Sequence, residues 1–163
     1  MTGATAGDAD CQAFVARYGA LFEHSLWVVE RAAMHLPLDD LYAGLMAVVL
    51  EASIEDRLAL IRAHPELAGK AAIDRTLTEA SASEQASAGL DRLTAEEYRR
   101  FHDLNRAYRE RFGFPFIICV RRTNKAGILA ALHRRLGNEP TQEMDTAIAE
   151  IGEIVRLRLG DLT

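Results

Sequence analysis

The chain has 163 residues, of which 49% are hydrophobic and 26% are charged, and its formal net charge is −5. A chain of this length and composition is expected to form one globular domain over residues 1–163. The negative charge argues against nucleic acid or an anionic membrane as a partner. An anionic small molecule would therefore have to be bound by a locally placed arginine.

The cysteines and the two ends of the chain indicate a cytoplasmic location. Cys11 and Cys119 have no metal-binding or redox spacing, so we expect two free thiols in a reducing compartment. The first residues are small and polar, unlike a signal peptide, and residues 1–8 are expected to form a flexible tail. No apolar run is long enough to cross a bilayer, and the final Gly-Asp-Leu-Thr is no peroxisomal signal.

Helical periodicity dominates the sequence. Ser53 with Asp56, and Thr94 with Glu97, have the spacing of capping boxes at helix starts, and Gly113 marks a helix end. The predicted helices cover residues 11–22, 25–35, 39–50, 53–63, 81–88, 94–112, 124–136 and a long segment from 141. The expected fold is an all-α, single-domain bundle of about eight helices.

One apolar run departs from this pattern. Residues 114–120 read Phe-Pro-Phe-Ile-Ile-Cys-Val, which is typical of a buried extended segment, yet no partner strand is predicted elsewhere. Buried peptide groups must be hydrogen-bonded, so this segment needs side chains or a ligand as partners.

His64 is followed by Pro65, and a residue before proline is driven out of the helical region. The helix before it should therefore end at His64, which places the imidazole at a helix C-terminus. The helix dipole there favours the protonated ring, as a proton donor requires. The alternative interpretation is a partly exposed cap residue without a catalytic role.

Ser81, Glu84 and Gln85 follow His64 by 17 to 21 residues. Ser81 and Glu84 have the spacing of a capping box, which is one interpretation of the pair. A helix start also presents free N–H groups to a bound oxyanion, and Glu84 with Gln85 would then line adjoining parts of a pocket.

Other catalytic motifs are missing from the sequence. There is no phosphate-binding glycine loop and no Gly-x-Ser-x-Gly nucleophile motif. No metal site is predicted, because no metal-ligand spacing links the histidines, which are residues 24, 35, 64, 102 and 133. Acid–base and electrostatic catalysis without a cofactor, or no catalysis, are the remaining possibilities.

Arg158 lies on the apolar face of the last predicted helix, four residues after Ile154 and three after Val155, whereas Arg156 lies on the polar face. A buried guanidinium needs a partner, either an internal carboxylate or a ligand.

Taken together, these segments resemble the OHCU (2-oxo-4-hydroxy-4-carboxy-5-ureidoimidazoline) decarboxylase family. The resemblance spans most of the chain, and Leu26 departs from it, where the family usually has proline. It rests on residues 22–27 (Phe-Glu-His-Ser-Leu-Trp), 63–70 (Ala-His-Pro-Glu-Leu-Ala-Gly-Lys), Ser81-x-x-Glu84-Gln85, 88–90 (Ala-Gly-Leu), Leu104-Asn105-x-x-Tyr108, 112–116 (Phe-Gly-Phe-Pro-Phe) and 156–159 (Arg-Leu-Arg-Leu).

The resemblance implies an all-helical homodimer that works without a cofactor and converts its substrate to (S)-allantoin in the last step of urate oxidation. It makes His64 the catalytic residue, with Glu84 orienting it or binding the ureido group of the substrate. The implied substrate contacts are Pro65, Ser81, Glu84, Gln85, the backbone of Phe116, Ile117, Ile118, Cys119 and Val120, and Arg158. The alternatives are an enzyme for a related ureide or hydantoin, and a non-catalytic helical interaction module.

Overall fold

The computed structural model describes residues 6–69 and 75–162, and this part of the chain is all-α, with eight α-helices, two 3₁₀ helices and no strand. The predicted fold class and the number of helices are therefore confirmed. None of the described helices is long and apolar enough to cross a membrane. The chain divides into two compact units: the first comprises residues up to Ala63 and from Val155 onward, and the second comprises residues 64–154.

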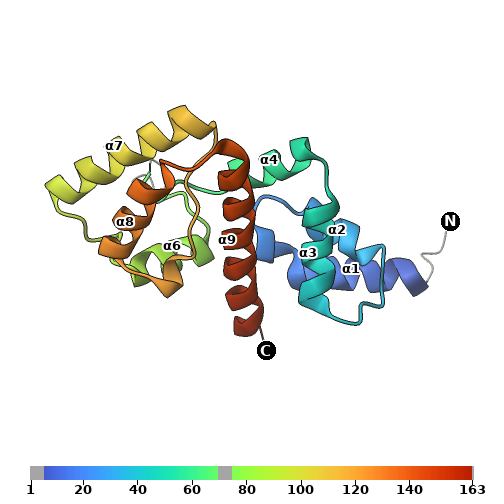
Figure 1. The fold of residues 1–163 in the computed structure, drawn as a ribbon. Helices are drawn as coiled ribbons and strands as arrows, with labels where there is room; N and C mark the ends of the chain where they lie inside the picture. Colours follow the sequence, from blue (N-terminus) through green and yellow to red (C-terminus); the bar gives the residue numbers. More distant parts are fainter. Residues whose placement is uncertain (1–5, 70–74, 163) are drawn as a thin grey trace. The chain divides into compact units, whose positions relative to one another are not determined.

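The first unit contains α1 (Ala6–Tyr18), η1 (Gly19–Phe22), α2 (Trp27–Ala33), α3 (Leu41–Glu51), α4 (Ile54–Arg62) and the end of α9 (Pro140–Asp161). The first five of these are the blue-to-green elements of Figure 1. Helix α2 packs against α1, η1 and α3. Its buried face and those of its neighbours supply a core that includes Phe22, Val28, Val29, Leu45 and Val49.

Helix starts in the first unit follow local capping rules. Asp40 accepts a hydrogen bond from the Ala43 N–H at 2.8 Å, and Ser53 accepts one from the Asp56 N–H at 3.1 Å. The first helix, however, begins at Ala6 and not at residue 11, so residues 6–8 are helical where a tail was expected. The rest of that predicted tail, residues 1–5, lies outside the described residues.

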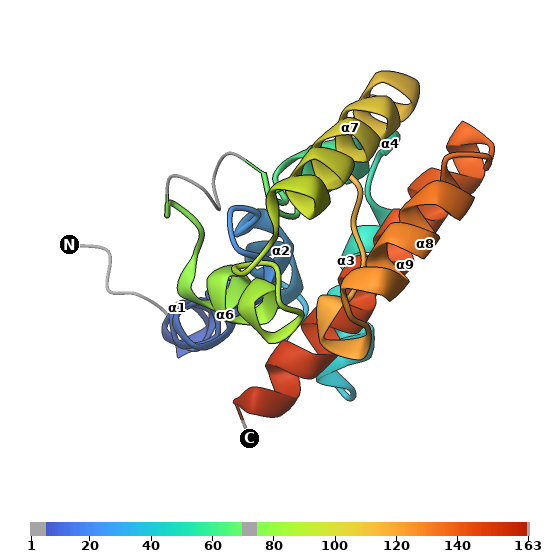
Figure 2. The same ribbon diagram turned by 90° about the vertical axis from the view of Figure 1, so that its left-hand side faces the viewer.

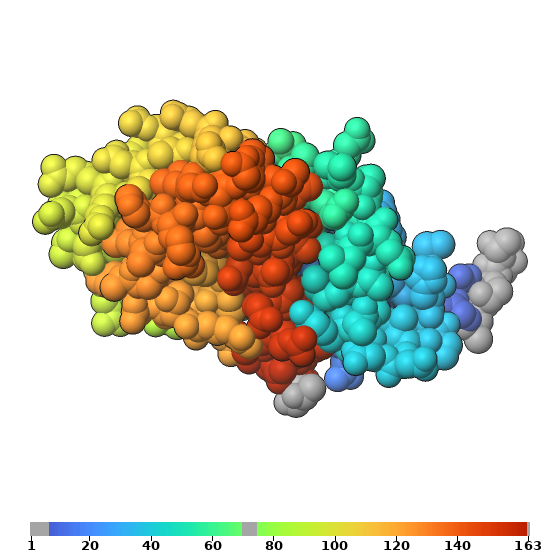
Figure 3. Space-filling view, in the orientation of Figure 1, coloured from blue at the N-terminus to red at the C-terminus, as the bar shows by residue number. Residues whose placement is uncertain are grey.

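The second unit contains α6 (Glu79–Ser87), α7 (Ala95–Phe112), η2 (Val120–Arg122), α8 (Lys125–Arg135) and the first part of α9. Helices α7 and α8 lie side by side in Figure 2 and adjoin on the surface in Figure 3, while α6 packs against η2. The predicted capping box of α7 is confirmed, because Thr94 and Glu97 exchange both hydrogen bonds. Gly113 ends this helix at a φ of +76°, a conformation that favours glycine.

The predicted start of α6 is wrong. The N-cap is Thr78, whose hydroxyl accepts a hydrogen bond from the Ser81 N–H at 3.2 Å. Ser81 therefore lies inside the helix and is buried, and the capping-box interpretation of Ser81 and Glu84 does not hold. Two hydroxyl residues three positions apart can each cap a helix, and periodicity alone did not separate them.

The apolar run at 114–120 is largely buried; its residues 115–119 form neither a helix nor a strand, and Val120 begins η2. Two of its peptide groups find side-chain partners, as expected for a segment without a neighbouring strand. The Ile117 carbonyl accepts a hydrogen bond from Arg135 on α8 at 2.7 Å, and the Cys119 N–H donates to Glu150 on α9 at 2.9 Å.

Arg135 also forms an ion pair with Glu143, whose exposed fraction is 0%. The Tyr108 hydroxyl donates to the same carboxylate at 2.6 Å, and Asn138 donates to its other oxygen at 3.0 Å. Burial and the hydrogen bond to Glu143 raise the pKa of Tyr108 above its ordinary value. This cluster joins α7, α8 and α9 in the core of the second unit.

We expect Glu143→Gln to lower the free energy of unfolding by about 3–5 kcal/mol, because it leaves the Arg135 charge buried without a counter-charge. Equilibrium urea unfolding followed by circular dichroism measures the change. Glu139→Gln, at an exposed position just before α9, should stay within about 0.5 kcal/mol of the parent. Equal stability of the two variants would contradict the importance of the buried pair.

Candidate functional site

His64 occupies the predicted helix break. Helix α4 ends at Arg62 with Ala63 as its C-cap, and the backbone at His64 and Pro65 is no longer helical. His64 is half-buried. His64 is thus the first residue of the second unit, directly beyond the C-terminal end of a helix.

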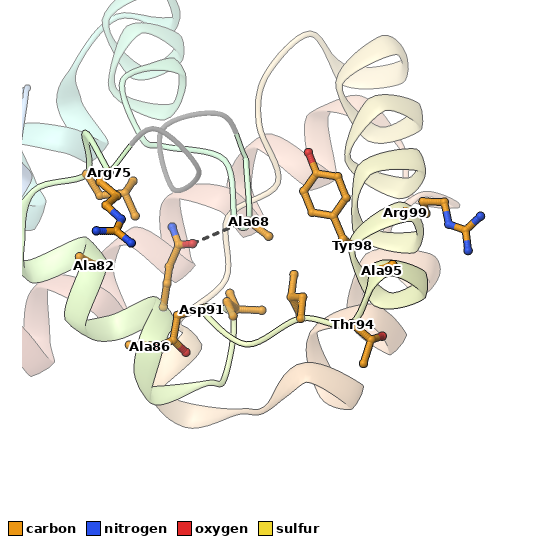
Figure 4. A pocket seen from close by; sticks show the side chains of 13 residues that line it. Ala68, Arg75, Ala82, Ala86, Asp91, Thr94, Ala95, Tyr98 and Arg99 are labelled. Carbon is orange, nitrogen blue, oxygen red and sulfur yellow. Dashed lines mark hydrogen bonds between the residues drawn. The ribbon is translucent and has the colours of Figure 1, made fainter.

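The segment that follows Pro65 is held by side chains of α6 and α7. Asn105 donates to the Leu67 carbonyl at 2.8 Å, and the Ala68 N–H donates to Gln85 Oε1 at 3.1 Å, the dashed bond in Figure 4. Arg109 pairs with Glu66 at 2.5 Å on the more exposed side. Ala68 adopts a φ of +53°, which is unfavourable for a residue with a Cβ, so these contacts hold a strained backbone.

Helix α6 presents Ser81 and Gln85 one turn apart on its buried side, and each residue is 5% exposed. Glu84 is half-buried, and its charge acts on Cys119 of the apolar run. Burial, followed by the carboxylates of Glu150 and Glu84, raises the pKa of the Cys119 thiol. Within the second unit, Gln85 therefore contacts Ala68, and the Glu84 carboxylate contributes to the raised pKa of Cys119.

The predicted backbone contacts at 116–120 lie in this region as well. Phe116, Ile117, Cys119 and Val120 are buried, whereas Ile118 is half-buried. The Ile117 carbonyl and the Cys119 N–H already bond to Arg135 and Glu150. Of the two kinds of partner expected for this segment, side chains are therefore present at these two groups.

Arg158 belongs to the first unit and is buried there, as the helical phase of the sequence predicted. Its Nη2 donates to Glu23 at 2.6 Å and its Nη1 donates to the Leu21 carbonyl at 3.2 Å. Arg156 is exposed, with its guanidinium 4.0 Å from the centre of the Tyr42 ring. Of the two partners considered for Arg158, the internal carboxylate is present.

A cavity of about 870 Å³ lies beside Gln85 in the second unit. Ala82, Gln85 and Ala86 of α6 form one wall, and residues around the start of α7 form another. In Figure 4 the Tyr98 ring points toward this space and Arg99 points away from it. Its lining is largely apolar, so the polar groups of Gln85 and Tyr98 are well placed to orient a ligand.

Several residues of this region have a role that the sequence did not predict. Asn105, Glu143 and Glu150 hold the site segments or the core, yet they were given no role. The positions of Glu143 and Arg135 did carry a signal, because each falls on the apolar face of its helix, four residues from Ala147 and Ala131 respectively.

Among the described residues, no group of three or more His, Cys, Asp or Glu side chains could hold a metal ion.

Comparison with known proteins identifies the class of this all-helical protein. A family model described as OHCU decarboxylase matches residues 8–160, which includes parts of both units. The chain belongs to the OHCU decarboxylase family.

Named relatives agree with this assignment. The chain is 43% identical to the 2-oxo-4-hydroxy-4-carboxy-5-ureidoimidazoline decarboxylase of Haloferax volcanii, over 93% of this chain and 90% of that protein. It is 40% identical to a uric acid degradation bifunctional protein of Bacillus subtilis, over 94% of this chain but only 31% of that protein.

Two solved structures are similar. The crystal structure of an (S)-allantoin synthase matches with a TM-score of 0.74 and 30% identity, over 93% of this chain and 50% of that one. An OHCU decarboxylase crystallised in the presence of (S)-allantoin matches with a TM-score of 0.65, over 93% of this chain and 96% of that one. At 24% identity, the second match supports the fold alone.

The buried pair of Arg158 and Glu23 has a measurable consequence. Arg158→Ala should destabilise the protein by about 3–5 kcal/mol, because it leaves the Glu23 carboxylate without its buried partner. Arg156→Ala removes only an exposed contact with Tyr42 and should cost about 1 kcal/mol or less. Thermal and urea unfolding of both variants decide the matter, and a larger loss at Arg156 would contradict the burial of Arg158.

Proposed function

We propose that this protein decarboxylates 2-oxo-4-hydroxy-4-carboxy-5-ureidoimidazoline to (S)-allantoin, the last step of urate oxidation. The observation that carries the proposal is the His64–Ala68 segment, attached to Gln85 of α6, in a chain that the family model matches over residues 8–160. The name of the Haloferax volcanii relative, at 43% identity, supports the same reaction.

The substrate makes this chemistry accessible to ordinary side chains. The carbon that loses carbon dioxide also carries a hydroxyl group and adjoins a ring C=N bond. The electron pair of the broken C–C bond flows into that C=N bond, so the substrate is its own electron sink and no cofactor is required. The enzyme must hold the ring, assist proton movement and protonate one face of the resulting ene intermediate.

His64 is the proposed proton-transfer residue. Its place beyond the end of α4 puts the imidazole near the negative end of a helix dipole, which favours the protonated form. A histidine that donates and accepts protons contributes about 10²–10⁴-fold to a rate. Pro65 is the adjoining contact and restricts the backbone that carries the ring.

Helix α6 supplies the proposed neighbours of the substrate: Ser81, Glu84 and Gln85. A carboxylate such as Glu84 can orient the imidazole or accept the ureido N–H groups, and both roles are part of the proposal. Gln85 carries an amide with two N–H donors besides the oxygen that Ala68 uses. Such donors suit the carbonyl oxygens of a urea-like group.

The backbone of residues 116–120 is the proposed partner for the hydrogen-bonding edge of the substrate. In an extended segment, the N–H and C=O of one residue face one side, and those of the next residue face the opposite side. The Ile117 carbonyl and the Cys119 N–H are engaged by Arg135 and Glu150. We therefore assign the ligand contact chiefly to the peptide groups of Ile118, on the opposite edge.

Arg158 completes the proposed set as a partner for the substrate carboxylate or a carbonyl oxygen. Its guanidinium already donates to Glu23 and to the Leu21 carbonyl, and these bonds fix the orientation of the side chain. The homodimer and the cytoplasmic location are included in the proposal as well, since they are what the family resemblance and the sequence imply.

An enzyme for a related ureide or hydantoin would keep the pocket but form another product, and an interaction module would form none. Urate-oxidation intermediates, prepared immediately before use, should give (S)-allantoin in excess when the protein is added. Circular dichroism of the product measures its chirality. Racemic allantoin formed at the uncatalysed rate would overturn the proposed function.

His64→Asn should retain the fold and lose most of the rate gain, by about 10²–10⁴-fold, because asparagine cannot transfer the proton. Initial decarboxylation rates are compared with those of His102→Asn, at an exposed position on α7. A folded His64→Asn enzyme with the parent rate and the parent excess of (S)-allantoin would remove His64 from the mechanism.

Exhaustive chelation should leave the activity unchanged, because the substrate supplies the electron sink. Elemental analysis should find metal well below one equivalent per chain. Loss of activity after chelation, restored by one added divalent ion, would contradict the cofactor-free reaction.

A further inference from the structure

One peptide group in the His64 segment is bonded at both of its polar ends by side-chain amides. The carbonyl of Leu67 and the N–H of Ala68 belong to the same peptide bond. Asn105 on α7 donates to that carbonyl at 2.8 Å, and Gln85 on α6 accepts from that N–H at 3.1 Å. We call this arrangement of Asn105, Gln85 and the Leu67–Ala68 peptide the amide clamp.

The amide clamp is buried throughout. Asn105 is 3% exposed and Gln85 5%, while Leu67 and Ala68 are 8% exposed each. Water therefore competes poorly for these bonds, and loss of either one leaves a buried peptide group unsatisfied. The third contact of the segment, Arg109 with Glu66, has an arginine side chain that is 50% exposed and is worth much less.

The clamp fixes a backbone that would not keep this conformation unaided. Ala68 has a φ of +53°, in the left-handed region that a residue with a Cβ seldom adopts. Gly69 closes the turn, and a Cβ there would lie 2.9 Å from the Cβ of Glu66. Only Pro65 and Glu66 separate His64 from the clamped peptide, and Pro65 limits the rotation of this short link.

We propose that Asn105 is a positioning residue for the decarboxylation, acting through the Leu67 carbonyl to set the place of the His64 ring. This inference rests on the proposed function. The clamp also orients the Gln85 amide, because its Oε1 accepts from the Ala68 N–H. The N–H donors of Gln85 are then directed away from Ala68, and we assign them to the proposed substrate. Asn105 itself contacts the backbone and not the reacting atoms.

The first test compares Asn105→Leu with the parent protein and with a control variant. Asn105→Leu removes the donor to Leu67 and fills the space, and Ile128→Val makes a small change on the buried face of α8. At a temperature where all three proteins are folded, kcat of Asn105→Leu should fall about 10²-fold, as expected for a misplaced catalytic group. Ile128→Val should keep the parent kcat.

Asn105→Asp adds a readout that a purely structural residue would not give. An ionised Asp cannot donate to the Leu67 carbonyl, whereas a protonated Asp can donate its O–H. Burial favours the neutral acid, so the ratio of the Asp variant's kcat to the parent's should rise as the pH falls. Taking the ratio cancels the titration that both enzymes share.

Hydrogen exchange at the Ala68 amide tests the clamp without reference to activity. Exchange should be markedly faster in Asn105→Leu than in the parent or in Ile128→Val. The inference is overturned if Asn105→Leu keeps the parent kcat, or if its Ala68 exchange is unchanged. A parent protein without decarboxylase activity would instead overturn the proposed function, and this inference with it.

Discussion

The second unit depends on the burial of one carboxylate. Glu143 has no exposed surface, and an isolated charge there would be prohibitively costly, so its partners must be in place for the unit to fold. The Nε of Arg135 forms the ion pair with Glu143, and its Nη1 donates a hydrogen bond to the Ile117 carbonyl. The Cζ atom of Arg135 also lies 4.4 Å from the centre of the Phe116 ring. The extended run that the proposed substrate contacts is therefore fixed by a charge pair in the core.

The first unit uses the same solution with different residues. Arg158 and Glu23 are both buried, and the Leu21 carbonyl shares the guanidinium. Glu23 adopts a φ of +50°, so the pair is made at a turn with an unusual backbone. In each unit a buried arginine connects a helix to an irregular segment. Irregular backbone needs such donors, since it has no regular ladder of hydrogen bonds.

Sequence reasoning succeeded where the determining physics is local. The caps of α4 and α7 and the break at His64 follow from neighbouring residues, and the phase of α9 correctly separated Arg158 from Arg156. The start of α6 was misplaced because Thr78 and Ser81 compete as caps. Asn105 could not have been given its role, because its partner Leu67 is 38 residues away and is a backbone group. Such pairings depend on tertiary packing, which no local pattern encodes.

Helix α9 has a consequence for how this protein can change during evolution. Glu143, Glu150 and Arg158 follow one another at intervals of seven and eight residues, about 1.9 and about 2.2 helical turns, and each meets a different partner. A substitution at one of them affects one contact. Insertion or deletion of a single residue would rotate every later side chain by about 100° and displace Glu150 and Arg158 together. We therefore expect relatives to differ in loop lengths long before they differ in the length of this helix.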